Sequence, residues 1–209
     1  DMIIAVDGPL ASGKGTIARA LADHFGLPHL DTGSLYRATG LAVIEAGIDP
    51  ADTGACARLA AQLDLAAIDE DRIRTAEAGA MASRVAAIPQ VREALFDLQR
   101  TFATQPGGAI LDGRDIGTVI CPDAEVKLFV TADAETRARR RWEELRAKGE
   151  ALSFETMLEQ TRERDARDAE RTDAPMRPAD DATLLDTSSL SIDAAVATAI
   201  RIVEKRQKA

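Results

Sequence analysis

The segment that most constrains this chain lies between an apolar run at residues 2–6 and a helical pattern that begins at Lys14. Its sequence, Gly8-Pro9-Leu10-Ala11-Ser12-Gly13-Lys14-Gly15-Thr16, has the Gly-x-x-x-x-Gly-Lys spacing of a P-loop. In a P-loop, backbone N–H groups at a helix N-terminus surround phosphate oxygens, and the lysine adds a mobile positive charge. The pattern predicts a phosphate-binding loop formed by Gly8, Ser12, Gly13, Lys14, Gly15 and Thr16. A simple glycine-rich turn would explain the glycines but not Lys14.

The residue after the lysine narrows the class of P-loop protein. Many P-loops carry Ser or Thr at that position as a magnesium ligand, whereas this chain has Gly15 followed by Thr16. The run Gly-Lys-Gly-Thr resembles the loop of nucleoside monophosphate kinases, which implies a metal held mostly through waters and a threonine that touches phosphate. This favours phosphoryl transfer between small molecules over a GTPase switch or a motor.

Composition excludes several classes of partner. The chain has 209 residues, a formal net charge of −9 and only 3% aromatic residues, which disfavours nucleic acid and anionic membranes as partners. Arginine accounts for 21 of the 26 basic residues, and arginine suits bidentate contacts to phosphate. Cys56 and Cys121 lie far apart without metal or redox spacing, so we expect two thiols. With no membrane-length apolar run and no charged-then-apolar leader, we expect a cytoplasmic protein. We also expect a monomer.

The hydrophobic pattern alternates short strands with longer helices. Strand-like runs lie at 2–6, 29–30, 109–111, 125–130 and 183–185, and helical patterns at 14–25, 34–46, 52–63, 74–86, 90–104, 134–148, 154–168 and 192–206. Such alternation predicts an α/β fold of the P-loop NTPase type, with three α/β/α layers around a five-stranded parallel sheet. Ligands in these folds bind at the carboxyl ends of the strands.

The lengths of the helical stretches predict how the domain is divided. We expect one P-loop kinase domain over 1–209, with a core at 1–46 and 107–209. The stretch 47–106 is helical and too long for a simple crossover, so it is interpreted as an inserted lobe. The resemblance to nucleoside monophosphate kinases implies that this insert binds the acceptor. The charged stretch at about 137–171 is interpreted as a mobile lid.

Polar residues follow the second predicted strand. Asp31 stands at the strand tip, and either Thr32 or Ser34 is placed to cap the next helix. Arg37 lies in the first turn of that helix, within reach of a second phosphate. A plain helix start would account for this run equally well.

A second polar run follows the third predicted strand. An aspartate that closes an apolar strand beside a P-loop commonly orients Mg²⁺ or its waters, so Asp112 is predicted to be an outer-shell magnesium residue acting through water. Arg114 and Asp115 follow in a turn bounded by Gly113 and Gly117, which suits close approach to a ligand. A salt-bridged surface turn is the alternative.

Four motifs, taken in order, resemble the bacterial cytidylate kinase family. They are Gly-Pro-x-x-Ser-Gly-Lys-Gly-Thr, Leu-Asp-Thr-Gly-Ser-Leu-Tyr-Arg, Ala-Ser-Arg-Val-Ala-Ala-Ile-Pro-Gln-Val-Arg and Asp-Gly-Arg-Asp-Ile-Gly-Thr-Val. The resemblance runs from about Met2 to the final helix and implies that ATP, with Mg²⁺, phosphorylates CMP or dCMP. Between Leu65 and Ile73 this chain is shorter than the family pattern, so we expect a trimmed, helical insert.

The resemblance also implies roles for individual residues. Thr32 and Arg37 would line the acceptor site, with Arg37 and Arg114 on the acceptor phosphate. Those around the cytosine would be Ser83, Arg92 and Asp115, those at the ribose Arg164 and Asp168, and Arg171 would lie near the phosphates. The chemistry is consistent, because a carboxylate such as Asp115 can accept the N4 amino group of cytosine but would repel the oxygen that uracil has there.

Two sets of charged residues recur at helical spacing. Arg137, Arg140 and Arg141 fall on one face of a helix, as do Arg164, Asp168 and Arg171. Many such runs are only solvated faces held by ion pairs. In an acidic P-loop protein, however, they favour a lid whose arginines close over the transferring group, and we expect Lys14, Arg137, Arg140, Arg141 and Arg171 to act in catalysis.

Three other functions remain open on the sequence alone. The nearest is a kinase on the same scaffold for AMP, UMP or shikimate, which the set Ser83, Arg92 and Asp115 argues against. A regulatory module that senses ATP without turnover would not need a second arginine-rich helix. A nucleic-acid-binding ATPase is disfavoured by the acidic charge and the few aromatic residues.

Overall fold

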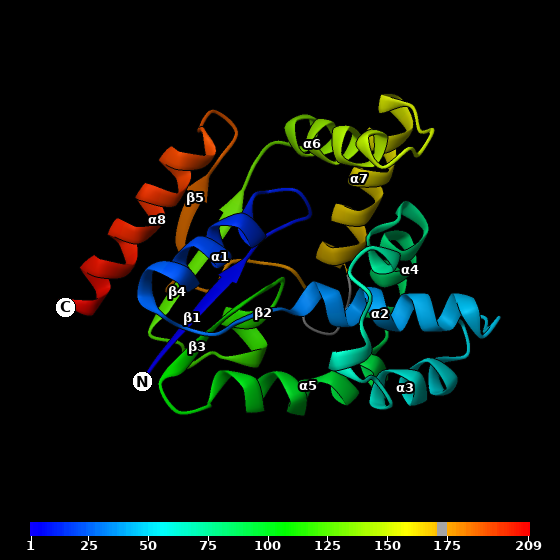
Figure 1. The fold of residues 1–209 in the computed structure, drawn as a ribbon, viewed down its shortest axis with the longest axis horizontal. Coiled ribbons are helices and arrows are strands. Elements are labelled where there is room, and N and C mark those ends of the chain that lie inside the picture. Colours follow the sequence, from blue (N-terminus) through cyan, green and yellow to red (C-terminus); the bar gives the residue numbers. More distant parts are fainter. Residues whose placement is uncertain (171–174) are drawn as a thin grey trace.

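A parallel β-sheet organises the fold, which is described here from a computed structural model covering residues 1–170 and 175–209. In this described part the sheet has five strands, β1 (Met2–Asp7), β2 (His29–Asp31), β3 (Gly108–Gly113), β4 (Val126–Thr131) and β5 (Thr183–Asp186). Their order across the sheet is β2-β3-β1-β4-β5, and every pair is parallel (Figure 1). The predicted five-stranded parallel sheet is confirmed.

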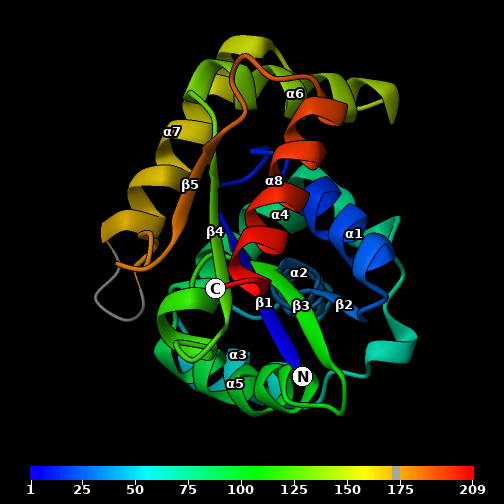
Figure 2. The same cartoon turned by 90° about the vertical axis from the view of Figure 1, so that its left-hand side faces the viewer.

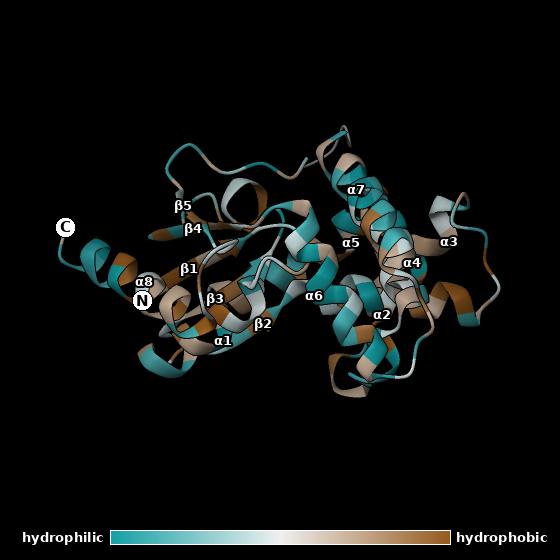
Figure 3. Cartoon of the chain, turned by 90° about the horizontal axis from the view of Figure 1, so that it is seen from above, coloured by the Kyte–Doolittle hydropathy of each residue, from teal (hydrophilic) through white to brown (hydrophobic). Residues whose placement is uncertain are grey.

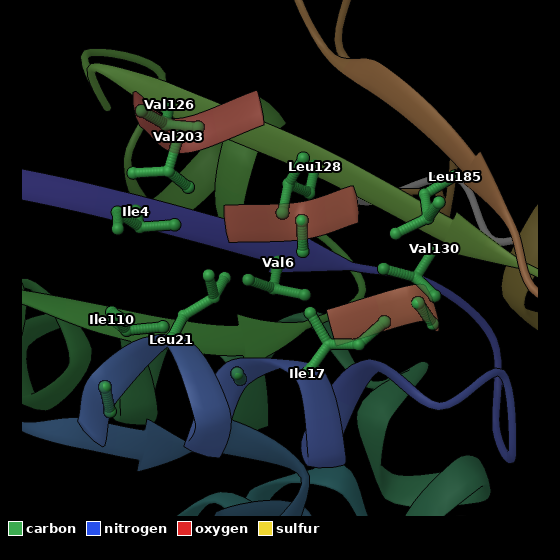
Figure 4. Close-up of a cluster of buried hydrophobic side chains, with 14 residues drawn as sticks. Ile4, Val6, Ile17, Leu21, Ile110, Val126, Leu128, Val130, Leu185 and Val203 are labelled. Carbon is green, nitrogen blue, oxygen red and sulfur yellow. The ribbon is translucent and has the colours of Figure 1, made fainter. Parts of the chain in front are cut away.

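The central strands are buried on both faces, as their continuous apolar sequences predict. On β1, Ile4 and Val6 face one side, where they pack with Ile110, Leu128 and Val130 (Figure 4). Ile3 and Ala5 face the other side, in a cluster with Leu111 and Ile116 among others. Alternate residues of one strand therefore serve two separate cores, which fixes the sheet as the middle of three layers.

Helices cover both faces of the sheet. On one face lie α1 (Lys14–Phe25) and α8 (Ile192–Gln207), which bury Ile17, Leu21 and Val203 against the strands (Figures 1 and 4). On the other lie α5 (Pro89–Ala103) and a short π-helix, η3 (Ile116–Ile120). Helix α1 ends at Gly26 with φ of 64°, a left-handed conformation that glycine adopts at little cost.

A helical lobe extends from one side of the sheet. It contains α2 (Thr32–Glu45), α3 (Thr53–Ala61), the 3₁₀ turns η1 (Leu65–Ala67) and η2 (Arg72–Arg74), and α4 (Ala76–Ala86), with α5 along its base (Figures 1 and 3). Its core joins Leu35 and Val43 of α2 to Val85 of α4 and Leu95 of α5. At Gly40 the α2 backbone approaches α4 so closely that a Cβ would meet the backbone of Ala82. The seven-residue bridge before Ile73 runs through the two short turns η1 and η2.

Two further helices lie above the strand ends, with α7 (Phe154–Glu170) running down at a large angle to α6 (Ala134–Ala147) (Figures 1 and 2). Helices α6 and α7 pack on each other through Ala138, Leu145 and Met157. The Trp142 indole donates to the Leu152 carbonyl at 2.7 Å and so ties the connection between the helices to α6. Figure 3 shows that α6 and α7 are predominantly hydrophilic, which matches their mixed charged sequences.

Several local features differ from the sequence-based expectation. Asp31, not Thr32 or Ser34, caps α2, because its carboxylate accepts the Ser34 N–H at 3.3 Å. Gly113 and Gly117 are explained by protein packing, because a Cβ at these positions would meet Thr32 Oγ1 and the Lys127 side chain respectively.

Cys56 and Cys121 are free, buried thiols, as expected. Within residues 1–170 and 175–209, none of the helices has the length and apolar character needed to cross a membrane.

Candidate active site

The P-loop connects the end of β1 to the start of α1 and lies at the carboxyl edge of the sheet. Gly8 lies so close to the Val130 carbonyl that a Cβ would collide with it, and Gly13 has φ of 97° at the helix start. Ala11 adopts a left-handed φ of 60°, which is uncommon outside glycine and marks a loop held in a specific shape. The Ser12 hydroxyl is buried and has no hydrogen-bond partner among the described residues. The loop is therefore shaped, with its backbone close to the strand ends, as a phosphate cradle requires.

A cavity of about 290 Å³, here called the P-loop cavity, opens over this loop. It joins the P-loop to the ends of β2 and β3, to the helical lobe and to α6 and α7. Its charged side chains are Lys14, Arg19, Asp31, Arg37, Arg74, Asp112, Arg114, Arg141, Glu144 and Arg164. Basic groups outnumber carboxylates at this one place in a chain whose net charge is −9, which suits an anionic ligand.

Lys14 is a buried cation in an electrostatically crowded place. Burial, and next the positive charge of Arg114, lower the pKa of the Lys14 ammonium to about 8, although Asp112 and Asp31 oppose the shift. Below it, Asp7 accepts the N–H groups of Ile116 and Gly117 at 2.8 Å each, and burial raises the pKa of this carboxyl to about 6. A phosphate placed beside Lys14 would restore its lost solvation and favour the charged form.

At the end of β2, the Asp31 carboxylate holds two neighbouring polar side chains. It accepts a hydrogen bond from the Arg37 guanidinium at 2.9 Å and from the Ser34 hydroxyl at 3.1 Å. Burial would raise the pKa of Asp31, but the charges of Arg37, Lys14 and Arg74 lower it to about 2. Arg37 is therefore held in the P-loop cavity by a carboxylate that stays ionised at neutral pH.

Asp112 ends β3 on the wall of the P-loop cavity and is joined to β2. The register pairs Asp31 with Asp112, and His29, two residues earlier, places its Nε2 atom 2.5 Å from Asp112 Oδ2. The Asp112 carbonyl accepts the Thr32 hydroxyl at 2.7 Å. In the described ranges no cluster of three or more His, Cys, Asp or Glu side chains could hold a metal ion. This donor set fits a magnesium ion that keeps most of its waters and contacts one carboxylate through them.

Arg114 projects from the residues after β3 and reaches α7. Its Nε donates to Asp168 Oδ2 at 2.7 Å, with both side chains mostly buried. Arg164, one turn earlier on α7, lines the P-loop cavity and has a buried Nε without a partner in the described part of the chain. Burial, and next the charge of Arg114, lower the pKa of the Arg164 guanidinium well below its usual range. The structure thus brings Arg114, Arg164 and Asp168 together.

Of the three residues predicted to surround the nucleobase, Ser83 and Arg92 lie in the helical lobe, on α4 and α5, and Asp115 lies between β3 and η3. Arg92 and Asp115 form a buried ion pair, and Arg92 Nη1 donates to the Ala86 carbonyl at 3.4 Å. The Arg92 guanidinium also lies 5.9 Å from the centre of the Tyr36 ring. Ser83 lines a second cavity of about 180 Å³ between α4 and α7, and its buried hydroxyl has no partner among the described residues. Ser83 therefore lies in a different environment from the Arg92–Asp115 pair, which joins α5 of the lobe to the segment after β3.

The three α6 arginines diverge in their contacts. Arg141 lines the P-loop cavity and pairs with Glu144 at 3.1 Å. Arg137 makes two contacts to the Asp165 carboxylate, at 3.0 and 2.6 Å, and so joins α6 to α7.

Arg140 turns away from the P-loop cavity towards the loop backbone. It donates to the Ala11 carbonyl at 3.0 Å, to Thr187 Oγ1 at 3.2 Å and to the Thr187 carbonyl at 3.0 Å. Thr187 Oγ1 in turn donates to the Ser12 carbonyl at 2.6 Å. Of the α6 set, only Arg141 therefore faces the P-loop cavity in this conformation. Arg171, also predicted to act there, lies outside the described residues.

The sequence did not single out several residues of this site. Arg19, Arg74 and Glu144 line the P-loop cavity, and His29 contacts Asp112. Asp7 carried a usable signal, because it ends an apolar strand directly before the P-loop in the same way that Asp112 ends β3. Arg19, Arg74 and Glu144 lie within helices or a 3₁₀ turn, where spacing alone does not distinguish a site residue from a solvated one. His29 lies on the short strand β2.

Solved structures share the fold at low sequence identity. An uncharacterised protein from Eubacterium ventriosum matches with a TM-score of 0.58 at 17% identity, covering 98% of this chain and 99% of that one. A shikimate kinase from Bacteroides thetaiotaomicron matches with a TM-score of 0.51 at 12% identity, covering 100% and 99%. These likenesses show the α/β fold of P-loop kinases.

Sequence relatives are far closer. A cytidylate kinase from Methylocella silvestris is 58% identical over 203 residues, covering 97% of this chain and 94% of that protein. One from Cereibacter sphaeroides is 61% identical over 204 residues, covering 98% and 96%. The model of the family described as "Cytidylate kinase" matches residues 4–205. With nearly its whole length matched, the chain belongs to the cytidylate kinase family.

Proposed function

We propose that the protein transfers the γ-phosphoryl group of ATP to the 5′-phosphate of CMP or dCMP, giving ADP and CDP or dCDP. The observation that carries this proposal is the meeting of two sets of cations in the P-loop cavity, Lys14 from the P-loop and Arg37 and Arg114 from neighbouring strand ends. Lys14 and the P-loop would be enough to bind one nucleotide. Arg37 and Arg114 are needed only if a second phosphate-bearing substrate is brought close to the first.

The reaction requires positioning and charge neutralisation more than proton transfer. Lys14 and the P-loop amides, from Gly8 to Thr16, bind the donor β- and γ-phosphates, while Arg37, Arg114 and Thr32 bind the acceptor phosphate. An oxygen of the acceptor phosphate attacks the γ-phosphorus in line. The bond from that phosphorus to the β–γ bridging oxygen breaks, and ADP leaves with the electron pair. No general base is needed, because the acceptor phosphate is already an anion.

Magnesium fits the donor side of this arrangement. When bound to the donor phosphates, Mg²⁺ neutralises part of their charge. Asp112 would hold its waters, since one carboxylate at the cavity wall is what an outer-shell role needs. The His29 contact at 2.5 Å orients that carboxylate.

The acceptor nucleoside is proposed to lie towards the helical lobe. Ser83, Arg92 and Asp115 would read the cytosine, with Asp115 accepting its N4 amino group. The buried, unpartnered Ser83 hydroxyl supports this assignment, because such a group is costly without a ligand or water. Arg164 and Asp168 would contact the ribose and Arg171 the phosphates.

The proposed division of labour follows the division of the chain. The core, 1–46 and 107–209, would hold ATP, the insert at 47–106 CMP, and the lid at about 137–171 would close over both and exclude water. Arg141 would enter the reaction centre directly. Arg137 supports closure as a rigid body, because its two contacts to Asp165 join α6 to α7.

The remaining expectations concern the location of the protein, its oligomeric state and its partners. We propose a cytoplasmic monomer whose partners are small nucleotides. The formal charge of −9 supports the exclusion of nucleic acid and of anionic membranes.

A coupled assay of ADP release, run with ATP and Mg²⁺ with and without CMP, tests the proposal. We expect ADP release that depends on CMP, with CDP identified by chromatography. Lys14→Ala is expected to remove turnover while leaving the fold intact by circular dichroism. Rapid ADP release without an acceptor, or near-normal turnover by Lys14→Ala, would contradict the mechanism.

A further inference from the structure

Arg74 is a cavity residue with no role in the mechanism described above. It ends the 3₁₀ turn η2, directly before α4, and its side chain lines the P-loop cavity together with Lys14, Arg37 and Arg114. The bridge between Leu65 and Ile73 leads straight into this turn. Arg74 therefore reaches the cavity from the helical lobe.

The Arg74 guanidinium shares its counter-ion with Arg37. Asp31 Oδ2 lies 2.9 Å from Arg37 Nη2 and 3.6 Å from Arg74 Nη2, so two guanidinium groups converge on one carboxylate oxygen. The second contact of Arg74, to Glu70 Oε2, is 3.4 Å long. Both Arg74 distances are longer than those of a strong charge-assisted hydrogen bond. The side chain is 33% exposed, so an incoming anion can reach it.

The charges around Arg37 suit the binding of an anion. Its pKa is lowered first by burial and then, among the like charges, by Arg74, Arg114 and Arg141, while Asp31 opposes the shift. Arg74, Arg114 and Arg141 are therefore close enough to Arg37 to repel its charge, and Asp31 is the carboxylate that opposes this repulsion. A phosphate dianion would offer several acceptor oxygens to their donors and relieve this repulsion.

The Arg74 backbone also links the cavity to the lid. Its carbonyl accepts a hydrogen bond from Arg141 Nη2 at 3.4 Å. Arg74 thus contacts the strand-end carboxylate with its side chain and the lid arginine with its backbone.

We propose that Arg74 supplies a third guanidinium of the acceptor-phosphate site. When the nucleotide binds, the Arg74 side chain moves from Asp31, which stays paired with Arg37, to the phosphate monoester. This inference rests on the proposed function, because it names a residue for the acceptor side of that reaction. It concerns the phosphate and not the base, so the same residue would serve CMP, dCMP and any other monophosphate that enters.

Arg72 provides a matched control in the same 3₁₀ turn. It is 57% exposed, pairs with Glu45 and does not line the P-loop cavity. The experiment compares Arg74→Ala, Arg74→Lys and Arg72→Ala with the wild type, measuring kcat and KM for CMP, UMP and ATP, and the CMP dissociation constant by calorimetry without ATP.

We expect Arg74→Ala to raise the CMP KM and dissociation constant about ten- to a hundredfold, the loss typical of one charge-assisted hydrogen bond, with the ATP KM unchanged. The UMP KM should rise by the same factor, and Arg74→Lys should restore part of the loss. Arg72→Ala should match the wild type. A structural role for Arg74 would instead raise the ATP KM as well or change the CMP-to-UMP ratio.

The outcomes separate this inference from the proposed function. If the wild type turns CMP over and Arg74→Ala keeps the wild-type CMP KM, the inference is overturned and the function stands. If the wild type shows no CMP-dependent turnover, the proposed function is overturned, and the inference about Arg74 with it. Thermal unfolding reports whether Arg74→Ala folds, and if it does not, the KM shifts of Arg74→Lys and of Arg74→Gln decide the question in the same way.

Discussion

Arg114 Nε and Asp168 Oδ2 lie 2.7 Å apart although their residues are separated by 54 positions in the sequence. The contact joins the carboxyl end of the sheet to α7, and both side chains are mostly buried. One partner is proposed to bind the acceptor phosphate and the other the ribose. The two residues are therefore held at the acceptor site by each other.

Removing this carboxylate should destabilise the unliganded protein. Asp168→Ala would leave Arg114 and Arg164 as neighbouring buried cations, and breaking a buried pair from one side costs about 3–5 kcal/mol. We expect a loss of that order in the free energy of unfolding, measured by urea denaturation. Asp97→Ala, an exposed aspartate on α5, is the control and should have little effect. Equal losses in the two variants would mean that the Arg114–Asp168 pair does not stabilise the fold more than an exposed aspartate does.

Much of the fold could be predicted from local sequence patterns. The runs at 2–6, 109–111 and 125–130 are apolar and short, and all three are strands in the structure. The pattern at 14–25 predicts α1 with the bounds that it has. The turns η1 and η2 and the π-helix η3 were not predicted, because three to five residues are too few for a periodic signal.

The candidate site divides in the same way between local and long-range features. The P-loop is a local motif, so its position at the start of α1 could be read directly. The partners of the arginines could not, because Arg137 meets Asp165 and His29 meets Asp112 only through the packing of helices and the register of strands. Helical spacing placed Arg140 beside Arg141 but could not tell that Arg140 bonds to Ala11 and Thr187.

The depressed pKa of Lys14 predicts proton uptake when ATP binds. With a pKa of about 8 in the free protein, the ammonium is about half deprotonated at pH 8, and the triphosphate would raise its pKa towards the ordinary 10.5. Calorimetric titrations at pH 8, in two buffers of different ionisation enthalpy, measure the protons taken up. We expect an uptake by the wild type that Lys14→Gln lacks; equal uptake by both would assign the proton elsewhere.

The lowered pKa of Lys14 also makes the stability of the protein depend on pH. Because the folded pKa of Lys14 lies below the unfolded value of 10.5, the unfolded chain binds more protons between pH 8 and pH 10.5. The contribution of this group to the free energy of unfolding therefore rises with pH across that window. Lys14→Gln should flatten the pH dependence there, as measured by denaturation at several pH values, and an unaltered slope would contradict the assignment.

The Arg92–Asp115 pair should determine the base preference. Asp115→Asn keeps the shape of the side chain but adds an amino group that opposes the N4 amino group of cytosine. We expect the ratio of kcat/KM for CMP over UMP to fall roughly ten- to a hundredfold. Asp123→Asn, which changes an exposed carboxylate paired with Arg100, is the control. An unchanged ratio in Asp115→Asn would show that the base is recognised by other residues.

Arg140 should act on the donor side of the reaction. Its bonds to the Ala11 and Thr187 carbonyls support the P-loop, so Arg140→Ala is expected to lower kcat roughly tenfold or more and to raise the ATP KM. The CMP KM should change much less. The neighbouring exposed Arg139, over the Phe154 ring, provides the control variant Arg139→Ala. A raised CMP KM with unchanged kcat would instead make Arg140 a residue that binds the acceptor.

The most direct test is kcat/KM for a panel of acceptors, CMP, dCMP, UMP, AMP and shikimate, with ATP and Mg²⁺. The account predicts that CMP and dCMP are the preferred acceptors, with UMP weaker because its base carries an oxygen where cytosine has the amino group. Turnover of AMP or shikimate above that of CMP would contradict it.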